Sequence, residues 1–242
     1  MVHFPKPHTP TIVDSDYQAL LTHLRSRGLL GQARESSLAV SIRRAHRGCF
    51  ALAVWDSALP FKRNPARSQL RQARLDAISC IPLALSGEYK AAALLERSIL
   101  EECLSYVYYF HHPVEFRWTL EDPKFIQTFR EFTEYATRLQ RLPRVSASPD
   151  LIPQVRELYW QCSSEVHGRI RATRNSSIVL TDARFRREAW DRFADRLPRI
   201  CALANMLLYA FHRDQFERFR IPFKTAVQMA MMPKQWRACL DS

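Results

Sequence analysis

One histidine beside an arginine-rich run is the part of this sequence best suited to chemistry. Residues 161–174 read QCSSEVHGRIRATR, in which His167 is followed by a glycine and then by Arg169, Arg171 and Arg174. Histidine exchanges protons near neutral pH, and arginine binds phosphate through a rigid fork that is always charged. This combination suits acid–base chemistry on a phosphodiester, or simple binding of one.

A polar stripe in an earlier stretch offers partners for this histidine. In LSGEYKAAALLERSILEECLSYVYYFHH, residues 85–112, Arg97, Glu101 and Ser105 share one side of a helix whose opposite side is apolar. If this helix lies beside the helix that carries His167, His167 would act as the acid or base of RNA cleavage. Arg97 would then bind the phosphate and Glu101 would orient Arg97 or His167, without a metal ion.

A simpler interpretation of the same residues stays open. A cation is favoured at the carboxyl end of a helix, so His167 is also what an ordinary helix terminus contains. Arg97 and Glu101 also have the spacing of an ordinary solvated ion pair, and such pairs contribute little to stability. The predicted catalytic set of His167, Arg97 and Glu101 therefore depends on how the two helices are arranged.

The overall charge favours a polyanionic partner. The chain of 242 residues has 36 Lys and Arg against 24 Asp and Glu, a net charge of +12, and a pI of about 9.8. Arginine supplies most of this excess, which makes nucleic acid the first partner to consider. A second basic patch, Arg43, Arg44 and Arg47 in SIRRAHRG, would contact phosphate or be solvated.

Several other classes of function are disfavoured. The five glycines form neither GxGxxG nor GxxxxGK[ST], so nucleotide binding through those loops is not expected. The six cysteines contain no CxxC pair and no histidines at ligand spacing, which predicts buried free thiols rather than zinc or disulfides. The longest apolar run, residues 200–211, is too short to span a bilayer, and no signal peptide is apparent. We expect a cytoplasmic protein with no cofactor, no metal and no membrane partner.

The hydrophobic period predicts an all-α protein with a single helical bundle. Asp122 and Asp182 are expected to begin helices as N-cap residues. Residues 142–149, LPRVSASP, are interpreted as a connection within one domain rather than a boundary. The predicted helices span about 14–27, 36–59, 65–85, 87–111, 122–141, 150–168, 182–217 and 222–240.

The segment SGEYKAAALLERSILEECLSY followed by LYWQCSSEVHGR resembles the HEPN superfamily of helical bundles, in particular its prokaryotic branches, over roughly residues 65–215. The resemblance implies a HEPN-like bundle over residues 65–242, with residues 1–64 as a helical extension packed on it. It also implies a homodimer that binds RNA in preference to DNA and acts as a metal-independent RNase of a toxin or antiviral system.

The sequence departs from active HEPN RNases in one respect. Those enzymes place an arginine a few residues before the histidine, whereas the nearest arginine upstream of His167 is Arg156. An alternative function therefore stays open. In that interpretation the protein is a non-catalytic basic helical subunit that binds nucleic acid or a partner protein in a defence or mobile-element complex.

Overall fold

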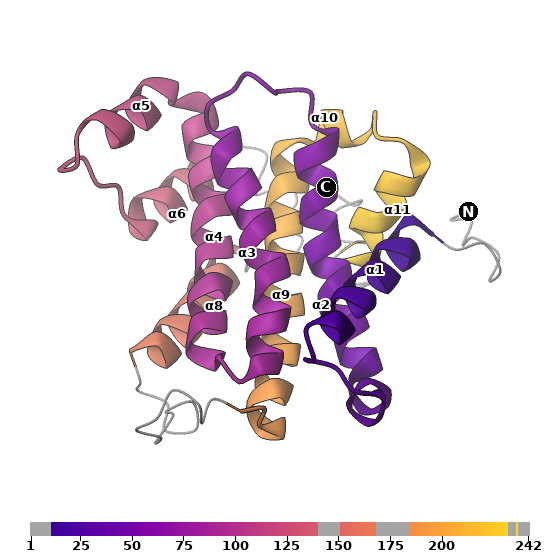
Figure 1. The fold of residues 1–242 in the computed structure, drawn as a ribbon. Coiled ribbons are helices and arrows are strands. Elements are labelled where there is room, and N and C mark those ends of the chain that lie inside the picture. The colour runs from indigo at the N-terminus through magenta and orange to yellow at the C-terminus, as the bar shows by residue number, and fades with distance from the viewer. Residues whose placement is uncertain (1–10, 140–150, 168–183, 232–235, 237–242) are drawn as a thin grey trace.

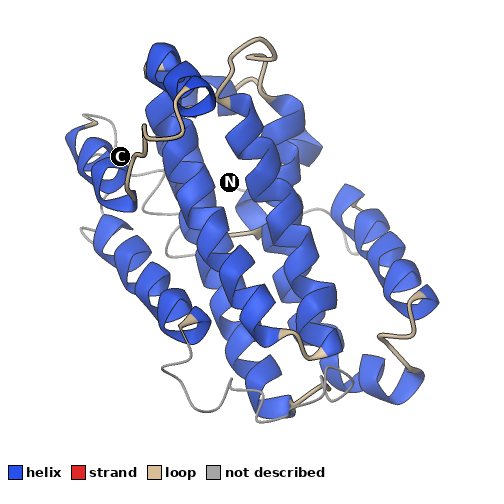
Figure 2. Ribbon diagram, turned by 60° about the vertical axis from the view of Figure 1, so that its left-hand side comes forward, coloured by secondary structure: helices blue, strands red, loops and turns tan. Residues whose placement is uncertain are grey.

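The protein is built from helices throughout the part of the chain that the structure describes (Figure 2). The computed structural model describes residues 11–139, 151–167, 184–231 and 236. The predicted all-α class is confirmed. The helices are α1 (Ile12–Ser26), α2 (Gln32–Ala58), α3 (Arg67–Ser86), α4 (Tyr89–His111), α5 (Pro113–Glu121), α6 (Phe129–Arg138), α8 (Leu151–Val166), α9 (Arg187–Phe211), α10 (Arg213–Phe216) and α11 (Ile221–Met229).

Four long helices, α2, α3, α4 and α9, form the centre of the bundle (Figure 1). Consecutive helices α3 and α4 make a hairpin, and α9 packs against both α2 and α4. On one side α8 and α6 cover α4, and on the other side α1 and α11 cover α2. Helix α4 therefore contacts α3, α6, α8 and α9, which makes it the helix around which any site on this side is arranged.

Local sequence signals explain several helix ends. Thr11 begins α1 and Thr128 begins α6, each through a capping box in which the threonine side chain and an acidic side chain, Asp14 or Glu131, satisfy backbone amides. Helix α3 ends at Gly87, whose φ of 91° is accessible to glycine but costly for other residues. A Cβ at Gly87 would also lie 2.4 Å from the carbonyl oxygen of Arg184, so the hairpin turn needs a glycine for two reasons.

Where α2 packs against α9, the indole nitrogens of two buried tryptophans are hydrogen-bonded across the contact, which we call the α2–α9 seam. The Trp55 indole N–H donates to Asn205 at 2.9 Å, and the Trp190 indole N–H donates to Ser41 at 3.1 Å. Five of the six cysteines lie in described residues and are free and buried, as predicted (Cys49, Cys80, Cys103, Cys162 and Cys201). The seam is thus an ordinary packed core in which large aromatic side chains keep their polar atoms paired.

Two predicted helices begin at other residues than expected. The segment 122–141 was predicted as one helix beginning at Asp122, which is wrong: Asp122 ends α5, an unpredicted helix, and accepts a hydrogen bond from the Lys124 amide at 2.9 Å. The physical reason is that Pro123 interrupts the run and that the capping box at Thr128 starts α6 later. Helix α9 begins at Arg187. Asp182 and residues 142–149 lie outside the described residues.

The close approach of α2 to α9 predicts the effect of a small substitution. In Gly48→Ala the new Cβ would lie 2.6 Å from Cys201 Cβ, so we expect a loss of about 1–3 kcal/mol in the free energy of unfolding, measured by urea denaturation. Gly31→Ala adds the same methyl group where no atom lies within 4 Å, and it should cost less. Helix propensity alone predicts that Gly48→Ala is at least as stable as the wild type. That result would contradict the close packing of α2 against α9.

Candidate functional site

The two helices that carry the predicted catalytic residues are neighbours. Helix α8 packs directly against α4, as the prediction required (Figure 1). Arg97 and Glu101, one turn apart on α4, form an ion pair with Nη2 of Arg97 3.2 Å from Oε1 of Glu101. Their partner on α8 is Tyr159, whose hydroxyl donates to the same Glu101 oxygen at 2.9 Å.

An aromatic stack holds this junction in place. The guanidinium of Arg97 lies 5.0 Å from the centroid of the Tyr159 ring, and Phe129 stacks on that ring at a centroid distance of 3.7 Å. Burial, together with the Glu101 carboxylate, raises the pKa of Tyr159 to about 12. Tyr159 therefore stays protonated as a hydrogen-bond donor to Glu101, which is also paired with Arg97; the catalytic roles predicted for these residues stay predictions.

The histidine is not part of this junction. His167 is exposed just beyond the end of α8, where its amide donates to the carbonyl of Ser163 at 3.0 Å. It lies eight residues past Tyr159, which corresponds to about 12 Å along a helix axis. The structure thus brings Arg97 and Glu101 together and places His167 at the edge of the bundle.

The helical spacing of Trp160, Ser163 or Ser164, and His167 predicts a polar and aromatic strip beside the apolar face of α8. Trp160 is 63% exposed and His167 is exposed, while Ser164 between them is half-buried. Ser163, the other serine considered for this strip, is buried. Arg169, Arg171 and Arg174, predicted to bind phosphate next to this strip, lie outside the described residues.

Two of the three arginines in the predicted basic patch on α2 have structural contacts. Arg44 donates to the carbonyl of Ala194 on α9 at 2.6 Å and lies 3.7 Å from Asp195. Arg43 stacks on the Tyr17 ring with its guanidinium 4.8 Å from the ring centroid, and it lies 3.9 Å from Asp14. Arg47 is half-buried. Their proposed role in phosphate binding stays a prediction.

A stronger basic surface was missed at the sequence level. Residues 57–75, SALPFKRNPARSQLRQARL, contain five cations and no acidic residue. We call these cations the α3 ridge (Lys62, Arg63, Arg67, Arg71 and Arg74). The signal that would have found it is the absence of carboxylates over 19 residues, rather than any local density of arginine.

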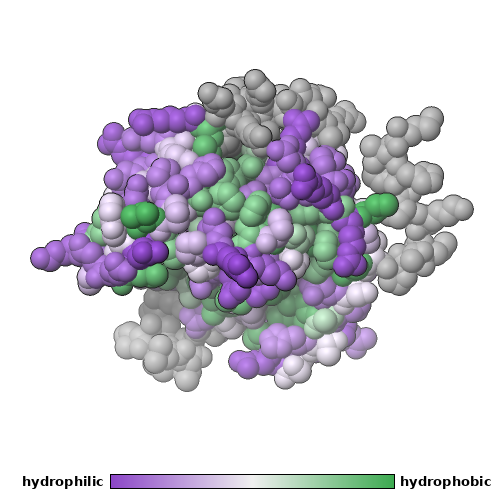
Figure 3. Space-filling view, turned by 90° about the horizontal axis from the view of Figure 1, so that it is seen from above, coloured by the Kyte–Doolittle hydropathy of each residue, from purple (hydrophilic) through white to green (hydrophobic). Residues whose placement is uncertain are grey.

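Most of the charge of the α3 ridge is not neutralised. Asp56 on α2 pairs with both Arg67 and Arg74, each at 3.2 Å. Lys62, Arg63 and Arg71 are exposed and have no ion pair within the described residues. The turn before α3 lies at the upper end of the bundle, and the view from above shows hydrophilic side chains gathered over this end (Figure 3). One carboxylate against five cations leaves this surface strongly positive.

A buried ion network joins three helices behind the Arg97–Glu101 pair. Arg196 on α9 donates to Glu96 on α4 at 2.5 and 2.9 Å, and to Glu165 on α8 at 2.8 Å. All three residues are buried. Burial raises the pKa of Glu96 to about 7 despite the nearby Arg196. The sequence did signal this network, because Glu96 occupies the same helical face as the core residues Ala92, Ile99 and Cys103.

This network makes a prediction about stability. Arg196→Met leaves two carboxylates buried without a cation, so we expect a loss of about 3–5 kcal/mol in the free energy of unfolding. Arg199→Met, three residues along α9, removes a surface pair in which Arg199 lies 3.9 Å from Asp195, and should cost less than about 1 kcal/mol. Equal destabilisation by the two variants in urea denaturation would show that the network carries no special energy.

A second raised carboxyl pKa lies between α3 and α4. Burial, with the charges of Asp76 and Glu101, raises the pKa of Glu102 to about 7. Asp76 is itself buried and accepts a hydrogen bond from Gln72 at 2.7 Å. Because Glu102 has no cation beside it, the folded protein favours its protonated form.

Glu96 and Glu102 should therefore each contribute less to stability as the pH rises from about 4.5 to about 7, whereas the buried imidazoles of His46 and His212, whose pKa values burial lowers, contribute in the opposite sense. In this window the folded state keeps protons on Glu96 and Glu102 that the unfolded chain has released, because both folded pKa values exceed the ordinary 4.5. Glu102→Gln mimics the protonated group, so it should be about 1–2 kcal/mol more stable than the wild type at pH 8.

Denaturation profiles between pH 5 and pH 8 check this expectation, because the stability of Glu102→Gln relative to the wild type should increase with pH. Glu121→Gln makes the same change at an exposed position on α5 and is the control. A stability difference between Glu102→Gln and the wild type that stayed constant over this pH range would contradict the raised pKa of Glu102.

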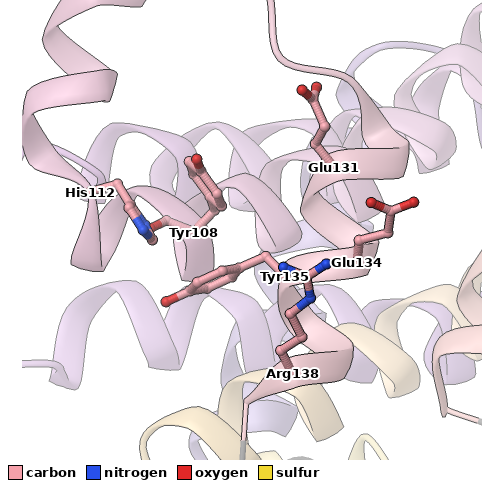
Figure 4. A pocket seen from close by; sticks show the side chains of 6 residues that line it. All are labelled: Tyr108, His112, Glu131, Glu134, Tyr135 and Arg138. Carbon is pink, nitrogen blue, oxygen red and sulfur yellow. The ribbon is translucent and has the colours of Figure 1, made fainter.

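A hollow of about 250 Å³ lies between the end of α4 and α6 (Figure 4). Tyr108 and His112 line it from the α4 side, and Tyr135 is among the residues that line it from α6. The polar atoms of these groups are engaged locally: Tyr108 donates to Glu115, and Tyr135 bonds His111 at 2.8 Å. None of the predicted site residues lines this hollow, and its contacts serve to anchor α6.

Comparison with protein-family models, curated proteins and solved structures finds no match to this chain. The HEPN-like identity of the bundle and the boundary after residue 64 therefore stay predictions. Within the described ranges, no helix is long and apolar enough to cross a membrane. In the same residues, no three His, Cys, Asp or Glu side chains are grouped to hold a metal ion.

Proposed function

We propose that this protein binds nucleic acid through its phosphate backbone, RNA in preference to DNA, without cleaving it. The observation that carries the proposal is the α3 ridge, where five cations share a single carboxylate. Lysine and arginine that neutralise phosphates release condensed counterions, and this release drives binding of nucleic acid. The preference for RNA rests on the resemblance to HEPN proteins.

The position of His167 favours binding over catalysis. A metal-independent RNase needs its acid or base and its phosphate-binding cation within reach of one phosphodiester. Arg97 is instead held by Glu101 and Tyr159, and His167 is exposed two turns farther along α8. RNA cleavage in a toxin or antiviral system, by a homodimer, is therefore the second candidate. A subunit that binds a partner protein in a defence complex is the third.

The α3 ridge can be tested with variants of matched charge. The triple variant Lys62→Gln, Arg63→Gln, Arg71→Gln removes three cations that have no ion pair in the described structure. The control Arg25→Gln, Arg130→Gln, Arg187→Gln removes three exposed cations that pair with Glu35, Glu134 and Asp191. Affinity for a labelled single-stranded RNA is measured by anisotropy between 50 and ~200 mM salt.

The ridge variant should bind weakly and lower the slope of log affinity against log salt by about 2, because each phosphate contact contributes roughly 0.7 on single strands. The control should keep most of the wild-type slope. If both triples lost affinity equally, general charge and not the ridge would drive binding.

Cleavage is tested separately with labelled total RNA and single-stranded DNA in EDTA. We expect wild type, His167→Ala and Arg97→Ala to leave both substrates intact. RNA cleavage by the wild type that both variants lose, while binding persists, would overturn the non-catalytic proposal and establish the predicted roles of His167 and Arg97.

A further inference from the structure

The outward side of α8 combines a cation, an exposed indole and a histidine in one row. Arg156, Trp160, Ser164 and His167 follow each other at spacings of four, four and three residues, which places them within about 80° of one another around the helix. Arg156, Trp160 and His167 are exposed and Ser164 is half-buried. We call these four residues the α8 stripe.

Trp160 differs from the other tryptophans in its surroundings. Trp55 and Trp190 are fully buried in the core. Trp118, 47% exposed on α5, lies in a short segment with the exposed apolar residues Val114 and Leu120, which is typical of a surface for protein contacts. Trp160 is 63% exposed, and its neighbours along the α8 stripe are polar. A large flat ring isolated among polar groups suits stacking better than it suits an apolar interface.

The position of the Trp160 ring is restrained through its neighbour Tyr159. Tyr159, the next residue, is edge-on to the Trp160 ring at a centroid distance of 5.5 Å, and Tyr159 is itself held by Phe129 and Glu101. The indole thus lies next to a tyrosine that contacts both α6 and α4. A rigid base lowers the entropy that a stacking partner would have to remove.

The cation beside the indole is available for phosphate. Arg156 donates to the hydroxyl of Thr133 at 2.9 and 3.2 Å, and it has no ion pair within the described residues. The nearby carboxylate of Glu157 accepts a hydrogen bond from Gln161 instead. A guanidinium one helical turn from an exposed ring provides both elements that a nucleotide needs, charge for its phosphate and a flat face for its base.

We propose that the α8 stripe binds single-stranded nucleic acid, with Trp160 stacking on an unpaired base and Arg156 contacting the adjoining phosphate. This proposal rests on the proposed function and names the form of its ligand. Bases in a duplex are already stacked on each other, so an exposed indole gains a base only where the strand is unpaired.

The test varies the base and the indole independently. Labelled oligoadenylate RNA is compared with an abasic ribose–phosphate oligomer of equal length and charge. The proteins are the wild type, Trp160→Ala, Trp160→Phe and Trp118→Ala, each checked for unchanged thermal unfolding. Anisotropy at about 50 and about 200 mM salt gives the affinity of every pair and its salt dependence.

The wild type should prefer oligoadenylate over the abasic oligomer by about tenfold, which is the usual size of one base–aromatic stack. Trp160→Ala should bind both oligomers as the wild type binds the abasic one, whereas Trp160→Phe should restore most of the preference. Trp118→Ala removes an exposed indole from another helix and should keep the full preference.

The outcomes separate the two proposals. If Trp160→Ala kept the preference for bases while the variants of the α3 ridge lost affinity, stacking at Trp160 would be wrong and backbone binding would stand. If the wild type bound neither oligomer in a salt-dependent way, both proposals would be wrong. A loss of affinity for the abasic oligomer in Trp160→Ala would also overturn stacking, because that ligand has no base.

Discussion

The contact between Arg196 and its two glutamates is the constraint on which the rest of this structure depends. Among the described residues, it is the one place where α4, α8 and α9 meet through buried charged groups. A buried ion pair adds little net stability over apolar residues of the same size. What it adds here is a penalty for any other arrangement, because a helix that slid by one turn would leave a carboxylate buried without its cation.

This constraint determines the register of α8 against α4, and the register decides which residues can act together. With Glu165 and Glu96 both held by Arg196, Tyr159 lies at the level of Glu101, where its hydroxyl reaches that carboxylate. The same register leaves His167 beyond the end of α8. At that position His167 is separated from Arg97 and Glu101, the cation and the carboxylate that the sequence pattern offered it.

The sequence was sufficient for most of the helices, because apolar period is set by burial on one face, but it could not establish that α4 and α8 are neighbours. It was insufficient where short-range signals competed: Pro123 and the capping box at Thr128 divided one expected helix, and the short helix α5 was missed. It was also insufficient for the site. Arg97 and Glu101 are recognisable as an i, i+4 pair, but the helical period places Tyr159 on the apolar face of its helix, and the position of its hydroxyl cannot be predicted from periodicity.

The arginines of this protein fall into two groups that composition alone does not separate. Arg44, Arg67 and Arg196 satisfy carbonyls or carboxylates between helices, so their charges are part of the folded structure. Arg71 and Arg156 form no ion pair within the described residues. The net charge of +12 therefore does not show where a ligand would meet unpaired positive charge, because it counts the two groups of arginines alike. The field that a polyanion meets is set by the second group, because a charge already paired within the fold attracts a distant phosphate only weakly.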